Sequence, residues 1–226
     1  MKKPVVDYRQ FRFSKLNEPE FSHLKLLLGW VIYFAMYFLT ENLIPAESCH
    51  PVHCFLDDLI PFSEWFFIPY FLWYFLVLFS LLYFALYNVD SFKKLSWFII
   101  ITQVVAMAVY IIYPTRQDLR PAVLPDNFLG NCTAFLYAFD TNTGVCPSLH
   151  VAYSIGIMSV FLKEKDVARW VKATLTVFIV IICLSTMFLK QHSAVDVFYA
   201  LLLGLFAEWL VYGKRHIKRI KERSLA

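Results

Sequence analysis

Residues 65–87 read WFFIPYFLWYFLVLFSLLYFALY, a run of apolar and aromatic side chains that contains no charged residue. A helix needs about 20 apolar residues to cross the hydrocarbon core of a bilayer, so this stretch predicts a membrane span. Of the 226 residues in the chain, 59% are hydrophobic, whereas soluble domains average roughly 45–50%. The whole chain is therefore expected to be a membrane protein.

Similar apolar runs lie on both sides of this stretch, at 24–43, 95–113, 147–162, 168–189 and 192–212. They are continuous rather than alternating, which favours helices over the strands of a barrel. The run at 147–162 is short and begins with polar residues. We expect an all-α integral membrane bundle of six transmembrane helices, forming one membrane-embedded catalytic domain over 1–226.

The basic residues indicate how the bundle sits in the membrane. Lys and Arg gather in four segments, which are the arm at 1–23, the turns at 88–94 and 163–172, and the tail at 213–226. Six spans place all four segments on one side, which the positive-inside rule identifies as cytoplasmic. We expect both termini in the cytoplasm, and basic runs that anchor the protein to anionic headgroups rather than to nucleic acid. Nothing in the sequence sets an oligomeric state.

The other connections face outward, and two of them each hold a pair of cysteines. Cys49 and Cys54 lie in the first, and Cys132 and Cys146 lie in the second. Disulfides form in oxidising compartments outside the cytoplasm. Both pairs are therefore candidates for disulfides, the second more so because it closes a longer loop.

Three ionisable residues lie where two of the apolar runs begin at this outer face. His150 belongs to CPSLHVAYS at 146–154, and His192 and Asp196 belong to KQHSAVD at 190–196. An ionisable side chain within a span costs a few kcal/mol, so its presence indicates function. A neutral imidazole can carry a transferred group covalently, a carboxylate can fix its tautomer, and a second imidazole can protonate a leaving oxygen.

Phosphoryl transfer also needs donors around the phosphate oxygens. The outer segments supply Arg116, Arg120, Ser148 and Lys190, together with backbone N–H groups at the start of the fourth span, where a helix dipole favours an anion. No cluster of carboxylates suited to Mg²⁺ is evident, because Asp57 and Asp58 are adjacent and point apart on a helix. We therefore expect neither a metal nor any other cofactor.

These residues resemble the three motifs of the type 2 phosphatidic acid phosphatase superfamily, which are K-x6-R-P, P-S-G-H and S-R-x5-H-x3-D. The resemblance covers about half the chain, from 113 to 196, and the six-helix topology extends it. The matching residues are Tyr113-x6-Arg120-Pro121, Pro147-Ser148-Leu149-His150 and Ser185-Thr186-x5-His192-x3-Asp196.

The resemblance implies a role for each matching residue. His192 would attack phosphorus and become phosphohistidine, while Asp196 would orient and polarise it. His150 would be the acid on the leaving oxygen, and Arg120 and Ser148 would hold the phosphate. Members of the superfamily need no metal.

The chain departs from the superfamily at three motif positions. Tyr113 stands in place of Lys, Leu149 in place of Gly, and Thr186 in place of the Arg that grips phosphate. Two expected cations are thus missing. Lys190 or Arg116 would be the substitutes, since both lie in outer segments.

The expected function is that of a multi-pass cell-membrane phosphatase that cleaves a phospholipid ester through phosphohistidine, with its site outside the cytoplasm. The motif P-S-L-H, together with a first motif that departs from the superfamily pattern, also resembles the branch related to inositol phosphorylceramide synthases. Sphingomyelin synthases are more distant relatives of that branch. A phospho-headgroup transferase is therefore the first alternative. A non-catalytic lipid-phosphate transporter that keeps the pocket is the second.

Overall fold

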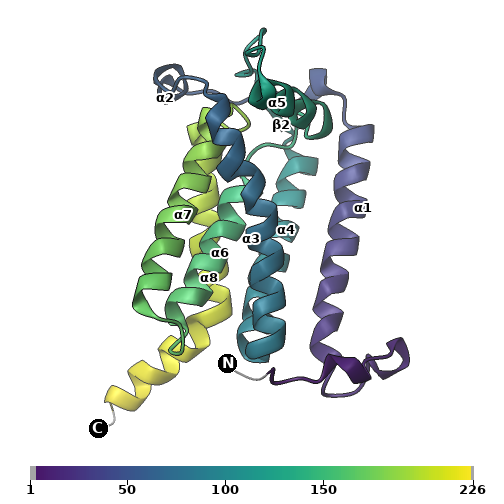
Figure 1. Ribbon diagram of the computed structural model, residues 1–226, viewed down its shortest axis with the longest axis vertical. Coiled ribbons are helices and arrows are strands. Elements are labelled where there is room, and N and C mark those ends of the chain that lie inside the picture. The colour runs from purple at the N-terminus through teal and green to yellow at the C-terminus, as the bar shows by residue number, and fades with distance from the viewer. Residues whose placement is uncertain (1–3, 225–226) are drawn as a thin grey trace.

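The computed structural model describes residues 4–224, and this part of the chain is mostly helical (Figure 1). Its two strands, β1 (His50–Pro51) and β2 (Thr115–Arg116), have two residues each. The helices are α1 (Leu28–Leu43), α2 (Phe55–Leu59), α3 (Phe67–Tyr87), α4 (Val89–Ile112), α5 (Phe128–Phe139), α6 (Leu149–Lys163), α7 (Arg169–Phe188) and α8 (Ala194–Ser224).

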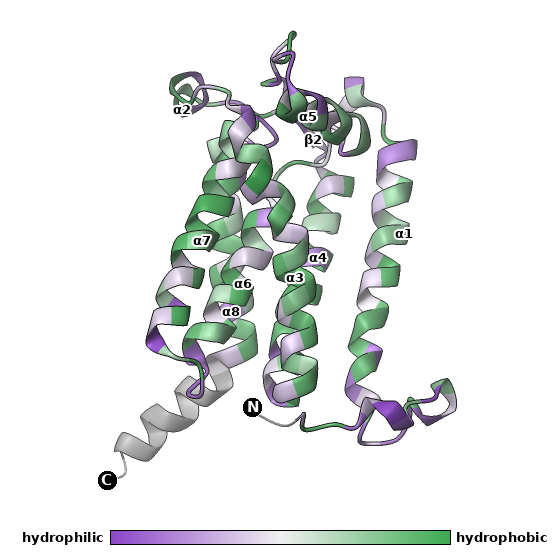
Figure 2. Cartoon of the chain, viewed as in Figure 1, coloured by the Kyte–Doolittle hydropathy of each residue, from purple (hydrophilic) through white to green (hydrophobic). Residues whose placement is uncertain are grey.

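Five helical segments are long and apolar enough to cross a membrane. They are Ser22–Leu43, Glu64–Tyr87, Val89–Ile112, Arg169–Phe188 and Ala194–Gly213. Figure 2 shows apolar residues along the middle of these helices and hydrophilic residues toward the two ends of the bundle. The all-α membrane bundle expected from the sequence is confirmed to this extent, and the number of six spans stays a prediction.

The remaining predicted span, 147–162, is α6, a shorter apolar helix of 15 residues. It packs against α4, α7 and α8, and ten of its residues are buried. At Gly156 an added Cβ would lie 2.5 Å from the ring of Phe98 in α4, so only glycine permits this close approach. Most of α6 is therefore covered by protein, and its two serines, Ser154 and Ser159, are buried.

Helix α4 begins six residues before the apolar run that predicted it at 95–113. Asn88 caps the helix, since its side-chain oxygen accepts a hydrogen bond from the backbone N–H of Ser91 over 3.2 Å. Asn is among the strongest N-cap residues. The polar segment predicted as a turn at 88–94 is therefore mostly the first turns of α4.

One end of the bundle, here called the loop end, carries the long connections (Figure 1). It holds α2, α5 and a small parallel sheet in which β1 (His50–Pro51) pairs with β2 (Thr115–Arg116). The sequence predicted loops for the whole of this region. Helix α5 is capped by Asn127, whose side chain accepts a hydrogen bond from the N–H of Gly130 over 2.9 Å.

The opposite end of the bundle holds the N-terminal arm and the connections α3–α4 and α6–α7 (Figure 1). The arm is tied to α3 by two hydrogen bonds, from the N–H of Val5 to the carbonyl of Leu86 and from the Tyr8 hydroxyl to the carbonyl of Ala85, both 2.8 Å long. The basic segments that precede α8 thus share one end, as predicted. In the predicted tail at 213–226, the side chains from 214 onward lie outside the described residues.

Candidate active site

His192 and Asp196 meet where α7 turns into α8, at the loop end. The imidazole Nδ1 of His192 lies 3.2 Å from a carboxylate oxygen of Asp196, which also accepts the N–H of Ser193 over 2.9 Å. The span predicted at 192–212 contains both residues, and four positions apart on one helix they would share a face. The structure makes this contact differently, because His192 precedes the helix and only Asp196 lies in its first turn.

The burial of this pair is close to complete. Asp196 has no exposed surface and His192 is 8% exposed. The first turn of a helix favours a negative charge, which helps to offset the cost of burying the carboxylate. The geometry fixes Nδ1 of His192 against Asp196 and leaves the other ring nitrogen, Nε2, free to act on a bound group.

His150 lies one residue inside the N-terminus of α6, and its ring is 5.8 Å from that of His192, measured between centroids. Aromatic rings of α3 surround it, with Trp73 at 4.1 Å and Tyr70 at 4.5 Å. Its Nε2 is buried and has no hydrogen-bond partner. The structure therefore brings the two predicted imidazoles together across one small space.

A backbone hydrogen bond joins the two motifs to each other. The N–H of Ser148, just before α6, donates to the carbonyl of Asp196 over 3.2 Å. The hydroxyl of Ser148 is fully buried and has no partner within the protein. A buried polar group without a partner calls for an explanation, and a bound oxyanion at the start of α6 would supply one.

Arg120 is also held at the loop end, but it points into the protein. Its guanidinium donates to the carbonyls of Tyr137, Asp140 and Thr141 and to the side-chain oxygen of Gln191, over 2.6–3.1 Å. Burial lowers its pKa from the ordinary value of 12.5. One N–H, at Nε, is buried without a partner.

Lys190 is not brought to this space. Its ammonium group donates to the carbonyls of Asp57 and Ile60 in the α2 segment, the first over 2.7 Å. Its backbone is in the left-handed region, with φ at 52°, which is uncommon outside glycine. Lys190 thus fixes the turn before His192 to α2 instead of facing a phosphate.

Arg116 and Tyr113 also lie elsewhere at the loop end. Arg116 pairs with Asp118 over 3.1 Å and donates to the carbonyl of Ala46 over 3.0 Å. The ring of Tyr113 stacks on that of His50, with 4.1 Å between centroids. Neither residue borders the cavity that contains the histidines, and the guanidinium of Arg116 is engaged by Asp118 and Ala46.

Both expected disulfides are absent, and Cys49, Cys54, Cys132 and Cys146 are free thiols. Cys49 is directed at the carbonyl of Pro45, 3.6 Å from its sulfur. Burial raises the pKa of Cys146 to about 12, which keeps it protonated, whereas disulfide exchange needs a thiolate. Cys132 lies on α5, a helix that the sequence did not predict.

The role of Asp57 was not predicted from the sequence, which gave no indication that this carboxylate borders a functional site. The buried carboxylate accepts hydrogen bonds from the hydroxyl of Ser193 over 2.6 Å and from the N–H of Ala194 over 2.8 Å. Burial raises its pKa, but these hydrogen bonds and that of the Cys54 N–H outweigh burial and lower the pKa overall. Asp57 therefore caps α8 from outside. No motif in the sequence predicts a contact between Asp57 and Ser193, which are far apart in the chain.

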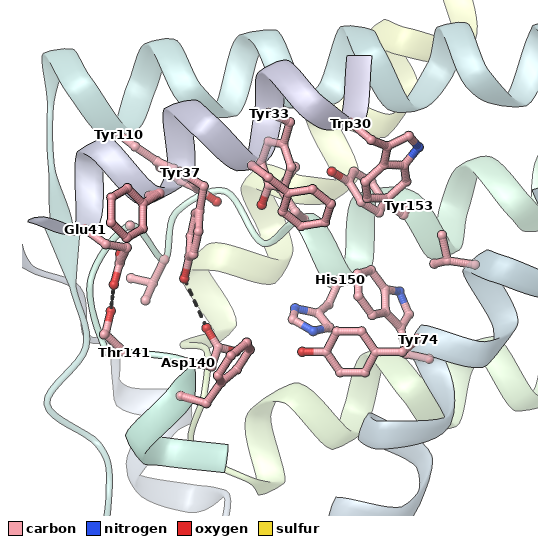
Figure 3. Close-up of a pocket in the computed structure, with 18 of the residues that line it drawn as sticks. Trp30, Tyr33, Tyr37, Glu41, Tyr74, Tyr110, Asp140, Thr141, His150 and Tyr153 are labelled. Atoms are coloured by element: carbon pink, nitrogen blue, oxygen red, sulfur yellow. Dashed lines mark hydrogen bonds between the residues drawn. The ribbon is translucent and has the colours of Figure 1, made fainter. Parts of the chain in front are cut away.

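A cavity of about 820 Å³ opens in front of the two histidines. It runs between α1 and α3, from His150 and His192 at the loop end to Leu27 and Leu81 near the opposite end. Figure 3 shows part of its lining, with Tyr37 of α1, Tyr74 of α3 and His150. Helix α1 packs mainly on α4, which leaves the space beside α3 open. Most of the lining is aromatic or aliphatic, as expected for a site that holds an acyl chain.

Comparison with known proteins adds one likeness of fold. No known family model matches the sequence, and no curated protein matches it. A crystal structure of LpxE from Aquifex aeolicus aligns with 82% of this chain and 95% of its own, at 19% sequence identity and a TM-score of 0.49. A likeness of this size does not identify an activity, which depends on the site itself.

Proposed function

We propose that this chain is a membrane enzyme that cleaves a phosphate ester of a lipid through a covalent phosphohistidine at His192. The observation that carries the proposal is the approach of two imidazoles from separate helices to 5.8 Å, with a buried carboxylate behind one of them. This arrangement supports membership of the type 2 phosphatidic acid phosphatase superfamily, which the spacing of the motifs indicates.

In the first step, Nε2 of His192 attacks phosphorus and the bond from phosphorus to the leaving oxygen breaks. His150 gives its proton to that oxygen, which departs as an alcohol. Asp196 stabilises the positive charge that forms on His192, as a carboxylate does in other triads. In the second step, water loses a proton to His150 and its oxygen attacks phosphorus, which breaks the phosphorus–nitrogen bond and frees His192.

The phosphate has donors at the start of α6. The Ser148 hydroxyl and the first N–H groups of that helix replace the charged side chains with which the superfamily binds phosphate. The unpartnered Nε–H of Arg120 is the candidate for a charged donor. Neutral donors bind an anion less strongly than charged ones. The unpartnered atoms of Ser148, His150 and Arg120 support this assignment, because all belong to the motif residues.

The substrate is a lipid on this proposal because the cavity is long, apolar and placed between membrane helices. An acyl chain would lie between α1 and α3 while the phosphate reaches the histidines. The active site would face outside the cytoplasm, as the positions of the basic segments predict.

The test uses the protein purified in detergent and phosphatidic acid labelled at phosphorus. We expect release of labelled phosphate, a rate that EDTA leaves unchanged, and labelled protein after rapid acid quenching. His192→Ala should abolish both turnover and labelling, whereas His53→Ala should preserve them, because His53 is an exposed imidazole paired with Asp58. A His192→Ala protein as fast as the parent would exclude the covalent mechanism.

The same assay separates the alternatives. Label that moves only to an added alcohol would identify a phospho-headgroup transferase, since hydrolysis and transfer share the first step and differ in the acceptor. A folded parent protein that binds the lipid phosphate without turnover of either kind would identify a transporter.

A further inference from the structure

The wall of the cavity that faces the histidines carries two carboxylates. Asp140 directly follows α5, and Glu41 lies near the end of α1. Both border the cavity, and Figure 3 shows them on the side opposite the His150 ring. Glu41 accepts hydrogen bonds from Thr141 and from Thr143. The sequence singled out neither carboxylate.

The charge of this lining is unusual for a site that binds phosphate. Among the described residues that border the cavity, the charged side chains are Glu41 and Asp140, and no Lys or Arg is present. Arg120 does not border the cavity; its terminal N–H groups donate to the carbonyl of Asp140 and to other acceptors, and its Nε–H has no partner. A phosphomonoester with two negative charges would be repelled by these carboxylates.

Asp140 is held firmly and retains an open acceptor. It accepts hydrogen bonds from the hydroxyls of Tyr37 and Tyr70, over 3.3 Å and 2.9 Å, and from the amide of Gln191 over 3.2 Å. An ionised carboxylate has about four acceptor sites, so at least one is left unfilled. No ion pair joins Asp140 to a cation within the described residues.

Aromatic rings from two helices complete this wall. Tyr33 and Tyr37 of α1 lie 6.0 Å apart between ring centroids. Tyr74 of α3 is 6.0 Å from the ring of His150, so the wall begins next to the reacting centre (Figure 3). The faces of tyrosine rings attract cations placed within about 6 Å of their centroids.

An independent feature indicates that this space takes a polar ligand. Tyr153 borders the same cavity and is 1% exposed, and its hydroxyl has no hydrogen-bond partner of good geometry, although the side chain of Gln103 lies beside it. A buried hydroxyl without a well-aligned partner is destabilising. A ligand in the cavity, or a water molecule bound beside that ligand, would supply the missing hydrogen bond to the Tyr153 hydroxyl.

We propose that Asp140, with the rings of Tyr37 and Tyr74, binds an ammonium group of the substrate, so that a zwitterionic phosphodiester is cleaved in preference to phosphatidic acid. The cation would lie against Asp140 while the phosphate lies between the histidines. Nε2 of His192 then bonds to phosphorus as the bond from phosphorus to the diacylglycerol oxygen breaks, diacylglycerol leaves with the proton of His150, and water releases the headgroup as its phosphate monoester. The single charge of a diester phosphate also suits a cavity whose described lining has no Lys or Arg. The inference rests on the proposed function for the reacting phosphate, but the cation subsite can be tested separately.

The catalytic test compares four lipids with the same acyl chains, whose headgroups are choline, ethanolamine, inositol and a bare phosphate. We expect kcat/KM for the two ammonium-bearing lipids to exceed the others by about tenfold, equivalent to about 1.4 kcal/mol. Asp140→Asn should lower the ratio of kcat/KM for choline lipid to that for phosphatidic acid by about tenfold. Asp118→Asn, which changes a carboxylate outside the cavity, should leave this ratio unchanged.

A preference for phosphatidic acid or for the inositol lipid would overturn the inference, as would an equal loss on all four lipids in Asp140→Asn. A second measurement does not depend on turnover. Trp30 and Trp73 border the cavity, so binding of choline and of its neutral analogue 3,3-dimethylbutanol can be followed by tryptophan fluorescence.

We expect choline to bind at least about tenfold more tightly than the neutral analogue, and Asp140→Asn to remove the difference. Equal binding of the two compounds would exclude a cation subsite. If no lipid were cleaved but choline bound selectively, the proposed function would fail and the subsite would stand.

Discussion

The N–H of Ser148 donates a hydrogen bond to the carbonyl of Asp196 over 3.2 Å. This bond joins the backbone that carries His150 to the backbone that carries His192, so the separation of the two imidazoles is set by main-chain contacts. The turn before His192 is fixed as well, since its N–H and that of Gln191 both donate to the carbonyl of Thr186 over 3.0 Å. Such preorganisation is what phosphoryl transfer requires.

Asp196→Asn is expected to lower kcat on the order of 10³-fold while leaving the protein folded. An amide can still accept the N–H of Ser193, but it cannot stabilise a positive charge on His192 or hold its tautomer. The measurement is kcat on labelled lipid, with the melting temperature as a check of folding. A loss below about tenfold would mean that His192 does not become cationic during turnover.

Asp57→Asn is expected to destabilise the loop end and to do so in a pH-dependent way. Hydrogen bonds to a charged group contribute about 1.5–3 kcal/mol each, and Asp57 accepts them from Ser193 and Ala194. Its pKa is lower in the folded protein than its ordinary 3.8. The stabilisation is therefore complete above the unfolded-state pKa of about 3.9 and is lost as the pH falls through the folded-state pKa.

Melting temperatures of the parent and of Asp57→Asn, measured in detergent from pH 7 to pH 3, check this prediction. The difference between the two proteins should shrink at the acid end of the range, because protonation removes the same charge from the parent. A constant difference across this range would show that the pKa of Asp57 is the same in the folded and unfolded states, so that its hydrogen bonds do not favour the ionised form.

The motif residues could be predicted from the sequence because the chemistry and the spacing were local. His150 and His192 each start an apolar run, and a helix that begins at such a residue places it at the membrane surface. The cavity wall could not be predicted in this way. Asp140 contacts Tyr37 and Tyr70 only because the connection after α5 folds back over α1 and α3. The periodicity of the sequence does not predict contacts between segments so far apart.

The helices at the loop end show a second limit of prediction from the sequence. Helix α5 has 12 residues and lies within a connection rich in Pro, Asn and Asp, whose composition predicts loops. Its start at Asn127 is a recognisable cap, but a helix this short is marginal without tertiary contacts. The substitutes suggested for the missing motif cations failed for a similar reason, since the carbonyls that bind Lys190 come from a segment about 130 residues away.

Lys190→Met is expected to act on stability and not on phosphate binding. The ammonium group of Lys190 binds the carbonyls of Asp57 and Ile60, and its loss should cost about 1.5–3 kcal/mol. We expect a lower melting temperature and an unchanged inhibition constant for orthovanadate, a phosphate analogue. Weaker vanadate inhibition without a change in melting temperature would instead assign Lys190 to the phosphate.

Leu78→Trp is expected to discriminate between lipid and soluble substrates. Leu78 lies on α3 and borders the cavity, so an indole there would occupy the space proposed for an acyl chain. Small changes of fit in an apolar pocket are worth about 10–200-fold in specificity. We expect kcat/KM for a long-chain lipid to fall at least about tenfold, and kcat/KM for a short-chain soluble ester of the same headgroup to stay within about twofold.

Phe79→Trp is the matched control, because Phe79 is the next residue of α3, is 59% exposed and does not border the cavity. This substitution should change neither value, since its side chain faces away from the proposed acyl chain. If Leu78→Trp and Phe79→Trp behaved alike on both substrates, the acyl chain would not lie between α1 and α3, and the lipid would have to reach the histidines from another side of the bundle.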